Sequence, residues 1–363
     1  MSLWKNILNI MKKIIKITTI NKKYSIIIEK NSILKFLNNE KKLKKKIFII
    51  IDSKVSKILN LNNSKINLIN INSSEKIKSI DHYWKIISIL LKLKIDRHST
   101  IIGIGGGTIG DLSGFIASTI LRGVRFILVP TTLLAQVDSS IGGKNGINSK
   151  YGKNLIGTFM QPDKVIIDPN ILASLSKREI KSGYAEILKH ALIGDYIFYK
   201  WLESYYKKIL NLNTEYLTKA IIKSVKVKAK FIESDEKENL TNTSSRAILN
   251  FGHTFGHALE AMNNYNQKIT HGEAISIGMA LASKISYKLK NISLLEYKNI
   301  LLHLDNIGLP KYDKRIKSNK IYEIIKSDKK NTKEKINLIL LDKIGKGYFE
   351  KGLTKAKISK LLN

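Results

Sequence analysis

Three of the seven histidines in the chain lie in one stretch, from Arg246 to Glu273. His253 and His257 are four residues apart, so on a helix they would lie on the same face, one turn apart. His271 follows after a short polar segment, which would let a second helix fold back beside the first. Zinc-type metals are bound by two or three imidazoles, often with one carboxylate, and a catalytic site keeps a position open for substrate. The spacing therefore favours a metal site.

Any carboxylate ligand has to come from elsewhere, because no Glu follows His253 as it would in a His-Glu-x-x-His motif. The segment GYAEILKHALIG is predicted to form a helix with Glu186, Lys189 and His190 on one face. The alternative is that the histidines cap helices or are hydrogen-bonded in the core. Two histidines four residues apart, with no third one nearby, would favour this alternative. The third histidine and the separate Glu-bearing helix favour a metal instead.

Composition limits the classes of protein to which the chain can belong. It has 363 residues, of which 43% are hydrophobic, enough for two domains with packed cores. No apolar run reaches the roughly 18 residues that a membrane-spanning helix needs. Cysteine is absent, so a metal has to be bound by His and carboxylate. The lack of disulfides fits the cytoplasm, which is the expected location.

The net charge is +34, from 63 Lys and Arg against 29 Asp and Glu. Such a charge attracts nucleic acid or anionic lipid without specificity. The lysines, however, are spread over the whole chain and form no basic tail or aromatic-interleaved patch. We therefore expect no specific nucleic-acid partner and no membrane partner.

Met1–Lys13 is expected to be a dispensable basic extension, with Met11 as an alternative start.

Residues 14–172 are predicted to form an α/β domain, because strands and helices alternate as in βαβ units with a largely parallel sheet. The predicted strands are Ile14–Thr19, Tyr24–Ile28, Ile47–Ile51, Ile66–Asn70, Thr100–Ile104, Arg125–Val129 and Val165–Asp168. The predicted helices are Ser32–Asn38, Ser53–Leu59 and Lys76–Leu93.

A glycine motif follows the strand Thr100–Ile104. Gly105, Gly107 and Gly110 match Gly-x-Gly-x-x-Gly between a strand and an apolar helix, where the backbone can approach a pyrophosphate at the helix N-terminus. The motif is not at the first strand, and no acidic residue follows about 20 positions later. We therefore expect a nucleotide site in a Rossmann-like domain of different topology. A tight turn that only packs helix against strand is the alternative.

Other polar residues of this domain are candidates for binding. Asp52 ends a strand and is suited either to a ribose hydroxyl or to capping the next helix. A second glycine-rich turn ends in Lys144 and is followed by Lys153 and Asn154, a set suited to an anion or phosphate. A surface hairpin is the alternative.

Residues 173–363 are predicted to form a mainly helical domain that holds all the metal-ligand candidates, with the boundary near Asp168–Ser176. The predicted helices are Ser176–Tyr199, Glu215–Glu233, Ser244–Met262, Gly272–Leu289, Ser293–Leu304 and Thr354–Leu362, with a weak strand at Asn331–Leu341.

Several long motifs occur in the order known from one family. They are GGGTIGDLSGF, RGVRFILVPTTLLAQVDSSIGGKNGIN, GKNLIGTFMQP, SGYAEILKH, LNFGHTFGHALEA and HGEA, from about Gly105 to Glu273. With them the chain resembles 3-dehydroquinate synthase, of the sugar phosphate cyclases. The resemblance implies an N-terminal Rossmann-like NAD-binding α/β domain and a mainly α-helical C-terminal metal-binding domain, with the catalytic metal in the cleft between them.

The resemblance also implies the reaction, a step of the shikimate pathway. The substrate is 3-deoxy-D-arabino-heptulosonate 7-phosphate, and the products are 3-dehydroquinate and phosphate. The reaction proceeds through transient oxidation by NAD, phosphate elimination, re-reduction and intramolecular aldol closure. One divalent metal is implied, zinc first and cobalt as an alternative, and the enzyme is expected to be a homodimer.

Site residues follow from the matched motifs. The implied metal ligands are Glu186, His253 and His271, so His257 is not a ligand and instead supports proton transfer near the phosphate. The implied catalytic residues are His257, Lys189, Asp138 and Asn250. The implied substrate-binding residues are Arg122, Lys144, Asn154, Lys228, Arg246, Lys329 and Lys330, with Arg122 reaching a neighbouring subunit.

The implied NAD-binding residues are Ser73, Ser74, Glu75, Lys76, Ile77, Lys78, Gly107, Thr108, Ile109, Gly110, Asp111, Thr131, Thr132, Lys144, Lys153, Ile171, Leu172, Ala173 and Ser174. Two departures from the family stand out. Ser74 replaces a glycine of the nucleotide segment, and the segment SDEKENLTNTSSR before Arg246 is longer than usual and lacks a glycine. The alternatives to a synthase are another sugar-phosphate cyclase and a metal-dependent polyol dehydrogenase, which would release NADH.

Overall fold

The computed structural model describes residues 12–42, 45–61, 67–263, 268–317, 319–326 and 335–362. Most of the expected extension Met1–Lys13, as well as Lys329 and Lys330, therefore lies outside the described residues. The chain divides into two compact units, Met1–Leu175 and Ser176–Asn363. None of the helices in the described ranges combines the length and apolar character needed to cross a membrane.

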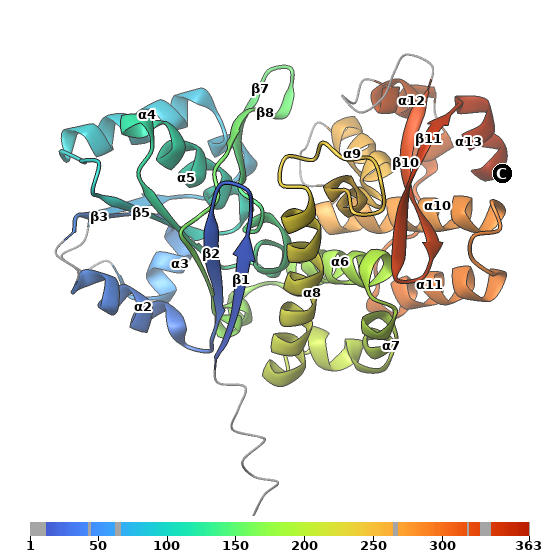
Figure 1. The fold of residues 1–363 in the computed structure, drawn as a ribbon, viewed down its shortest axis with the longest axis horizontal. Coiled ribbons are helices and arrows are strands. Elements are labelled where there is room, and N and C mark those ends of the chain that lie inside the picture. The colour runs from blue at the N-terminus through green and yellow to red at the C-terminus, as the bar shows by residue number, and fades with distance from the viewer. Residues whose placement is uncertain are drawn as a thin grey trace, which may run out of the picture. The chain divides into compact units, whose positions relative to one another are not determined.

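The first unit is built on a seven-stranded sheet with the order β1-β2-β9-β6-β5-β3-β4, drawn in blue to green in Figure 1. Strands β1 and β2 are antiparallel, and the other neighbours pair in parallel. The central strands are continuous apolar runs because both faces of the sheet are covered. The strands are β1 (Lys13–Thr18), β2 (Lys23–Ile28), β3 (Ile47–Asp52), β4 (Asn67–Ile71), β5 (Thr100–Gly105), β6 (Arg125–Pro130) and β9 (Lys164–Ile167).

The helical segments of this unit connect the strands. The α-helices are α2 (Ser32–Lys41), α3 (Ser53–Ile58), α4 (Ile80–Lys92) and α5 (Gly107–Thr119). Short 3₁₀ turns are η1 (Glu75–Ile77), η2 (Ile120–Arg122) and η4 (Pro169–Ser174), and η3 (Ala135–Ser139) is a π-helix. The predicted alternation of strands and helices is confirmed. The predicted helix Lys76–Leu93 starts too early, because Ser79 is extended and its hydroxyl caps α4 by accepting from the His82 amide at 3.3 Å.

The chain changes direction in the sheet between β3 and β5. From β3 it passes through α3 to β4 on one side, whereas from β5 it passes through α5 to β6 on the other. Parallel α/β sheets bind ligands outside the carboxyl ends of the strands at such a point. The glycine motif after β5 and Asp52 at the end of β3 both lie there. The order of the sheet thus places the glycine motif at the edge where sheets of this kind bind ligands, although the motif does not follow the first strand.

The part of the chain that connects β6 to β9 contains a hairpin. Strand β7 (Lys144–Ser149) pairs antiparallel with β8 (Gly152–Phe159), so this segment is a hairpin, while the binding of an anion by its Lys144, Lys153 and Asn154 stays a prediction. It packs on α5 at a close approach, since a Cβ on Gly114 would lie 1.9 Å from Asn145 Oδ1. The two strands were not predicted.

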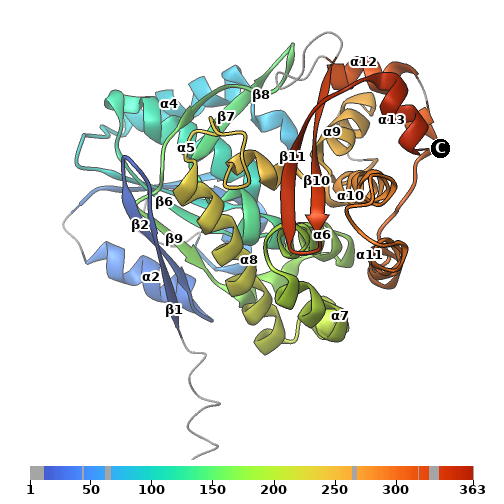
Figure 2. The same ribbon diagram turned by 45° about the vertical axis from the view of Figure 1, so that its right-hand side comes forward.

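The second unit is mainly helical, as Figure 2 shows in yellow-green to red. Its helices are α6 (Lys177–Gly194), α7 (Tyr196–Leu210), α8 (Thr214–Ser234), α9 (His253–Met262), α10 (His271–Lys288), α11 (Leu294–Ile307), α12 (Asn319–Lys326) and α13 (Lys355–Leu362), with 3₁₀ turns η5 (Arg246–Asn250) and η6 (Lys314–Lys317). It also contains the antiparallel pair β10 (Ile336–Lys343) and β11 (Lys346–Leu353), of which only the first was predicted.

Two predicted helices of this unit are wrong because each is broken. Ser176–Tyr199 is interrupted at Asp195, which is extended and caps α7 by accepting from the Phe198 amide at 2.8 Å. Ser244–Met262 is interrupted at Gly252, whose φ of +80° is left-handed. Helix α9 therefore begins at His253.

A buried histidine makes the stability of this unit depend on pH. Tyr184 Oη lies 3.0 Å from Nε2 of His303, and burial lowers the pKa of His303 to about 4. The folded pKa is below the unfolded value, so the unfolded state binds the extra proton as the pH falls from about 6.5 to about 4. We expect the free energy of unfolding to fall by up to about 3 kcal/mol across this window. Chemical denaturation of wild type and His303→Gln should show a difference in stability that shrinks towards pH 4; a constant difference would contradict it.

Candidate active site

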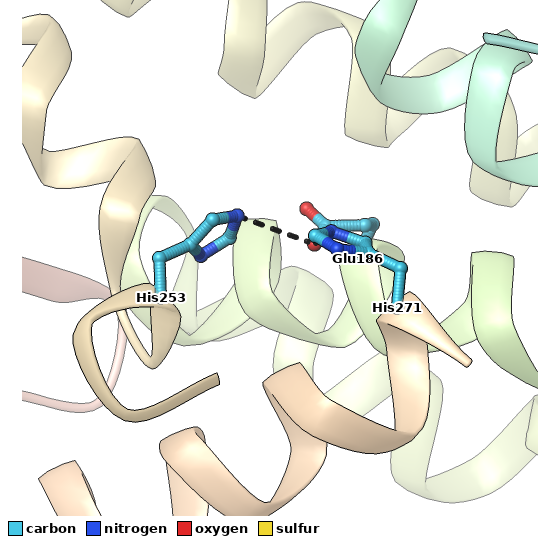
Figure 3. A group of neighbouring side chains, drawn as sticks. All are labelled: Glu186, His253 and His271. Carbon is cyan, nitrogen blue, oxygen red and sulfur yellow. Dashed lines mark ion pairs between the residues drawn. The ribbon is translucent and has the colours of Figure 1, made fainter. Parts of the chain in front are cut away.

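Three segments of the second unit bring a carboxylate and two imidazoles together. The donor atoms of Glu186, His253 and His271 all lie within 4.8 Å of one another (Figure 3). Glu186 Oε1 is 3.4 Å from His271 Nε2 and 3.8 Å from His253 Nε2. Glu186, on α6, is 0% exposed, whereas His271 is the most exposed of the three. This donor set matches that of a catalytic zinc site, which leaves further positions for substrate.

Glycines allow the helices that carry the two histidines to pack closely. A Cβ on Gly278 of α10 would lie 1.9 Å from the Gly252 carbonyl oxygen, and one on Gly256 would lie 2.7 Å from Ile275 Cδ1. Gly252, with its left-handed φ, also turns the chain into α9. The two glycines of Phe-Gly-His-Thr-Phe-Gly-His therefore set the contact between α9 and α10, which fixes His253 relative to His271.

The start of α10 is fixed against α6 in a similar way. A Cβ on Gly272 would lie 2.3 Å from Ser182 Cα, and the Gly272 amide donates to Ser182 Oγ at 3.0 Å. Glu273 forms a capping box with Thr270 and accepts a two-pronged hydrogen bond from Arg178 at 2.8 and 2.7 Å. In the His-Gly-Glu motif, His271 thus offers a nitrogen that can bind a metal. Gly272 and Glu273 fix the position of His271 relative to α6, the helix that carries Glu186.

The close approach at Gly278 predicts a large loss of stability on substitution. Gly278→Ala should lower the free energy of unfolding by about 3 kcal/mol or more, because the new methyl group meets backbone that cannot rotate away. The matched control is Gly110→Ala in α5, where a Cβ makes only ordinary contact, 3.5 Å from Leu128 Cδ2. The control should be neutral or slightly stabilising. Denaturant titration with zinc absent measures both, and equal stabilities would show that the approach is not tight.

The electrostatics differ between the two histidines. Burial lowers the pKa of His253 well below its usual value, and the nearby Lys189 ammonium adds to the effect. Burial also lowers the pKa of His271, but Glu260 and Glu186, one on each side of its ring, outweigh this and raise it to about 10. His253 is therefore available as a neutral ligand, while His271 lies between two anions.

Two of the implied catalytic residues lie beside these donors. Lys189 is 1% exposed and forms an ion pair with Glu186 one turn earlier on α6. His257 is exposed, and its ring centroid lies 5.0 Å from that of His253 and 6.2 Å from that of His271. His190, which lies on α6 with Glu186 and Lys189, is hydrogen-bonded to Ser224 Oγ at 2.6 Å.

Asn250 ends η5, and its amide donates to Glu238 Oε1 at 2.7 Å. It lines a small pocket together with His253 and His257. The other lining residues are Ala247, Thr254, Asn337, Ile339 and Phe349. The β10–β11 pair therefore supplies one wall of a pocket beside His253 and His257, which the sequence did not indicate.

Arg246 lies at the end of a segment that connects α8 to η5. The Asp235 carboxylate organises this segment, accepting from the amides of Asn239 at 2.8 Å, Leu240 at 3.1 Å and Arg246 at 3.0 Å. Arg246 is 4% exposed, and its guanidinium donates to the Glu236 carbonyl at 2.5 Å. Lys228 of α8 is also buried, at 6% exposed.

A second set of possible metal donors overlaps the first. One donor atom from each of His257, Glu260 and His271 also lies within 4.8 Å of the others. Sequence reasoning missed Glu260, although its spacing of three from His257 on a helix would have placed the two side chains together. Glu186 is fully buried and His257 exposed, so the two sets differ in their access to solvent.

In the first unit the glycine motif forms a backbone cradle. Gly106 caps α5, and a Cβ on Gly107 would lie 2.9 Å from Ser139 Oγ. This buried hydroxyl has no hydrogen-bond partner among the described residues. Gly103 packs strand against helix, since its Cβ would lie 2.1 Å from Ser113 Oγ. The turn thus combines close helix–strand packing with free backbone at a helix N-terminus, as a pyrophosphate requires.

Lys78 joins three segments of the implied nucleotide site. It is 4% exposed, and its ammonium contacts Asp111 Oδ2 at 2.6 Å and the side-chain oxygen of Asn154. Glu75 lies 3.9 Å from the same ammonium and accepts from Asn148 Nδ2 at 2.8 Å. The segment Ser73–Lys78 is therefore held to both α5 and the β7–β8 hairpin.

The remaining implied residues of the first unit lie as follows. Thr131 and Thr132 follow β6, Lys144 and Lys153 lie on the hairpin, Ile171–Ser174 is in η4, and Asp138 is in η3. Arg122 is exposed and, like Leu121, has a left-handed φ. Asp52 Oδ1 caps α3, accepting from the Lys54 amide at 2.7 Å, so the cap is confirmed for this residue and a contact with a ribose hydroxyl stays a prediction.

Comparison with known proteins agrees with this architecture. The N-terminal domain model of 3-dehydroquinate synthase matches residues 68–182, and the C-terminal domain model matches residues 183–331. The chain is 43% identical over 349 residues to 3-dehydroquinate synthase of Pelagibacter ubique, covering 93% of this chain and 94% of that one. It is 46% identical to that of Dictyoglomus turgidum, covering 82% of each chain.

Among solved structures, 2-epi-5-epi-valiolone synthase from Streptomyces hygroscopicus, with NAD⁺ and Zn²⁺ bound, has a TM-score of 0.83 and 23% identity, covering 93% of this chain and 95% of that one. The fold is thus the two-domain fold of a sugar phosphate cyclase. The chain belongs to the 3-dehydroquinate synthase family.

Proposed function

We propose that the chain is a 3-dehydroquinate synthase that converts 3-deoxy-D-arabino-heptulosonate 7-phosphate to 3-dehydroquinate and phosphate. The reaction comprises transient oxidation, elimination of phosphate, re-reduction and aldol closure, and it serves the shikimate pathway, aromatic amino acid biosynthesis by way of chorismate. The observation that carries the proposal is the convergence of Glu186, His253 and His271 in a chain of this family.

The residues at this convergence fit a divalent metal, with zinc first and cobalt second. A fully buried carboxylate faces two imidazole nitrogens, and this mixed oxygen and nitrogen donor set suits zinc. When bound, the metal would polarise a substrate hydroxyl and lower its pKa. Glu186, His253 and His271 would hold it, and the buried Lys189 ammonium would offset the charge of Glu186.

The cradle after β5 fits the pyrophosphate of NAD. Its support is the bare backbone at Gly106 and Gly107, the N-terminus of α5 and the buried Ser139 hydroxyl. When bound, NAD⁺ would accept a hydride from the substrate and return it in the same turnover. The Lys78 ammonium contacts the carboxylates of Glu75 and Asp111, and these three residues would line one edge of the nucleotide site.

The other residues would bind and orient the substrate. Lys228 and Arg246 are buried cations suited to a carboxylate. Lys144, Asn154 and Arg122 would bind the phosphate. His257, exposed beside His253, would support proton transfer near the departing phosphate, while Asn250 and Asp138 would orient the reacting hydroxyls. We further propose a homodimer in which the exposed Arg122 serves the neighbouring subunit, and a cytoplasmic location.

A second candidate is a metal-dependent polyol dehydrogenase, and a third is another sugar-phosphate cyclase. A dehydrogenase needs the metal donors and the glycine cradle but has no use for cations that bind phosphate and carboxylate. The buried Lys228 and Arg246 therefore favour a substrate with a carboxylate, as the synthase reaction requires.

The test is product formation from the heptulosonate phosphate by the purified enzyme, followed by NMR. We expect 3-dehydroquinate to form only when both NAD⁺ and zinc are supplied, and to stop forming after dialysis against a chelator until zinc is restored. Conversion of a different sugar phosphate alone would place the chain with the other cyclases.

A further inference from the structure

His271 lies between two carboxylates, one at each ring nitrogen. Its Nε2 is 3.4 Å from Glu186 Oε1, and its Nδ1 is 3.4 Å from Glu260 Oε2. His253 is held in a comparable way, since its Nε2 faces Glu186 at 3.8 Å and its Nδ1 lies 3.2 Å from the Phe251 carbonyl oxygen. In each histidine, Nε2 faces Glu186 and Nδ1 faces a hydrogen-bond acceptor.

A metal bound at Nε2 would select one tautomer of each ring, because Nε2 would then give its lone pair to the metal and the proton would be on Nδ1. A carbonyl or carboxylate oxygen only accepts, so the partner of each Nδ1 suits that proton. Metal-binding histidines depend on such a partner for their orientation and basicity. The acceptor for His253 is neutral backbone next to the helix start, whereas the acceptor for His271 is a charged side chain eleven residues away.

We propose that Glu260 is a positioning residue for the metal site: its carboxylate holds Nδ1–H of His271, so that Nε2 is directed to the metal together with Glu186 and His253. The inference rests on the proposed metal site. Glu260 is suited to this role because it is only 9% exposed and lies on α9, two turns beyond His253. Helix α9 thus supplies one ligand and fixes the ligand supplied by α10.

The rival assignment makes Glu260 itself a ligand, together with His257 and His271. The two roles predict different results. A direct ligand is as indispensable as Glu186, whereas a positioning residue tunes the affinity. Loss of such a partner costs about 10- to 100-fold in metal affinity.

The experiment measures the affinity of the full-length protein for Zn²⁺ by competition with a chromophoric chelator. The proteins are wild type, Glu260→Gln, Glu186→Gln and the control Glu215→Gln, which removes one negative charge from an exposed position on α8. The thermal midpoint of each zinc-free protein reports on the fold. We expect Glu260→Gln to bind Zn²⁺ about 10- to 100-fold more weakly with an unchanged midpoint, Glu215→Gln to match wild type, and Glu186→Gln to bind far more weakly than either.

The outcomes separate the two claims. An affinity of Glu260→Gln within about threefold of wild type would overturn the positioning role alone, as would a loss as complete as that in Glu186→Gln. A wild type that binds no zinc would overturn the metal site as well. Should Glu260→Gln fail to fold, NMR of the zinc-bound wild type with ¹⁵N-labelled histidine decides: Nδ1 of His271 should carry the proton, and zinc bound at Nδ1 would refute the role.

Discussion

Glu186→Gln is expected to abolish tight zinc binding and to lower turnover at least about 1,000-fold. Glu186 is the only carboxylate of the proposed ligand set, and glutamine has almost the same shape but offers a neutral oxygen. The measurements are zinc affinity by chelator competition and the rate of phosphate release. Glu215→Gln serves as the control for the removal of one negative charge.

The stability of this variant needs its own measurement, because Lys189 loses its buried partner. Removing one member of a buried ion pair costs about 3–5 kcal/mol. Glu186→Asp keeps the charge with a shorter side chain, so it should retain more stability than Glu186→Gln while still binding zinc poorly. Full turnover by folded Glu186→Gln would show that Glu186 is not a ligand.

His257→Asn is expected to lower kcat by about 100- to 10,000-fold, as the loss of a group that transfers a proton does. Zinc affinity should stay within about threefold of wild type, because His257 lies outside the set of Glu186, His253 and His271. Single-turnover phosphate release and chelator competition measure the two effects separately. Loss of zinc together with activity would instead favour the set of His257, Glu260 and His271.

Most of the first unit could be predicted because its buried strands have a strong pattern. Strands β3 and β5 are short apolar runs between helices, and the glycine motif marks the turn after β5. The β7–β8 hairpin was only an alternative and its two strands were not predicted, because KNGINS and GKNLIGTF are rich in Gly, Asn and Lys and do not alternate clearly between polar and apolar residues. Its strands are held by packing on α5 instead.

The helix breaks in the second unit were missed for a related reason. Gly252 and Asp195 each lie inside a helical pattern of apolar residues, where one glycine or one polar residue is tolerated. Only the packing of Gly278 against Gly252 explains why the chain turns there. The break matters for the site, since it places His253 at the first position of α9.

The candidate site was only partly accessible from spacing. Two histidines four residues apart suggest that both bind metal, and it was the family resemblance that separated His253 from His257. The structure adds what spacing cannot provide: Nε2 of His253 faces Glu186, whereas His257 is exposed one turn later. Glu260 was missed because its partner, His271, is on another helix.

The central claim, a cyclase that regenerates its NAD, is tested most directly by following two signals in one reaction. Enzyme, zinc, NAD⁺ and the heptulosonate phosphate are mixed, and phosphate release and absorbance at the NADH band are recorded together. The account predicts phosphate and 3-dehydroquinate in equal amounts, with no net NADH after many turnovers. Accumulation of NADH without release of phosphate would contradict it and identify a dehydrogenase.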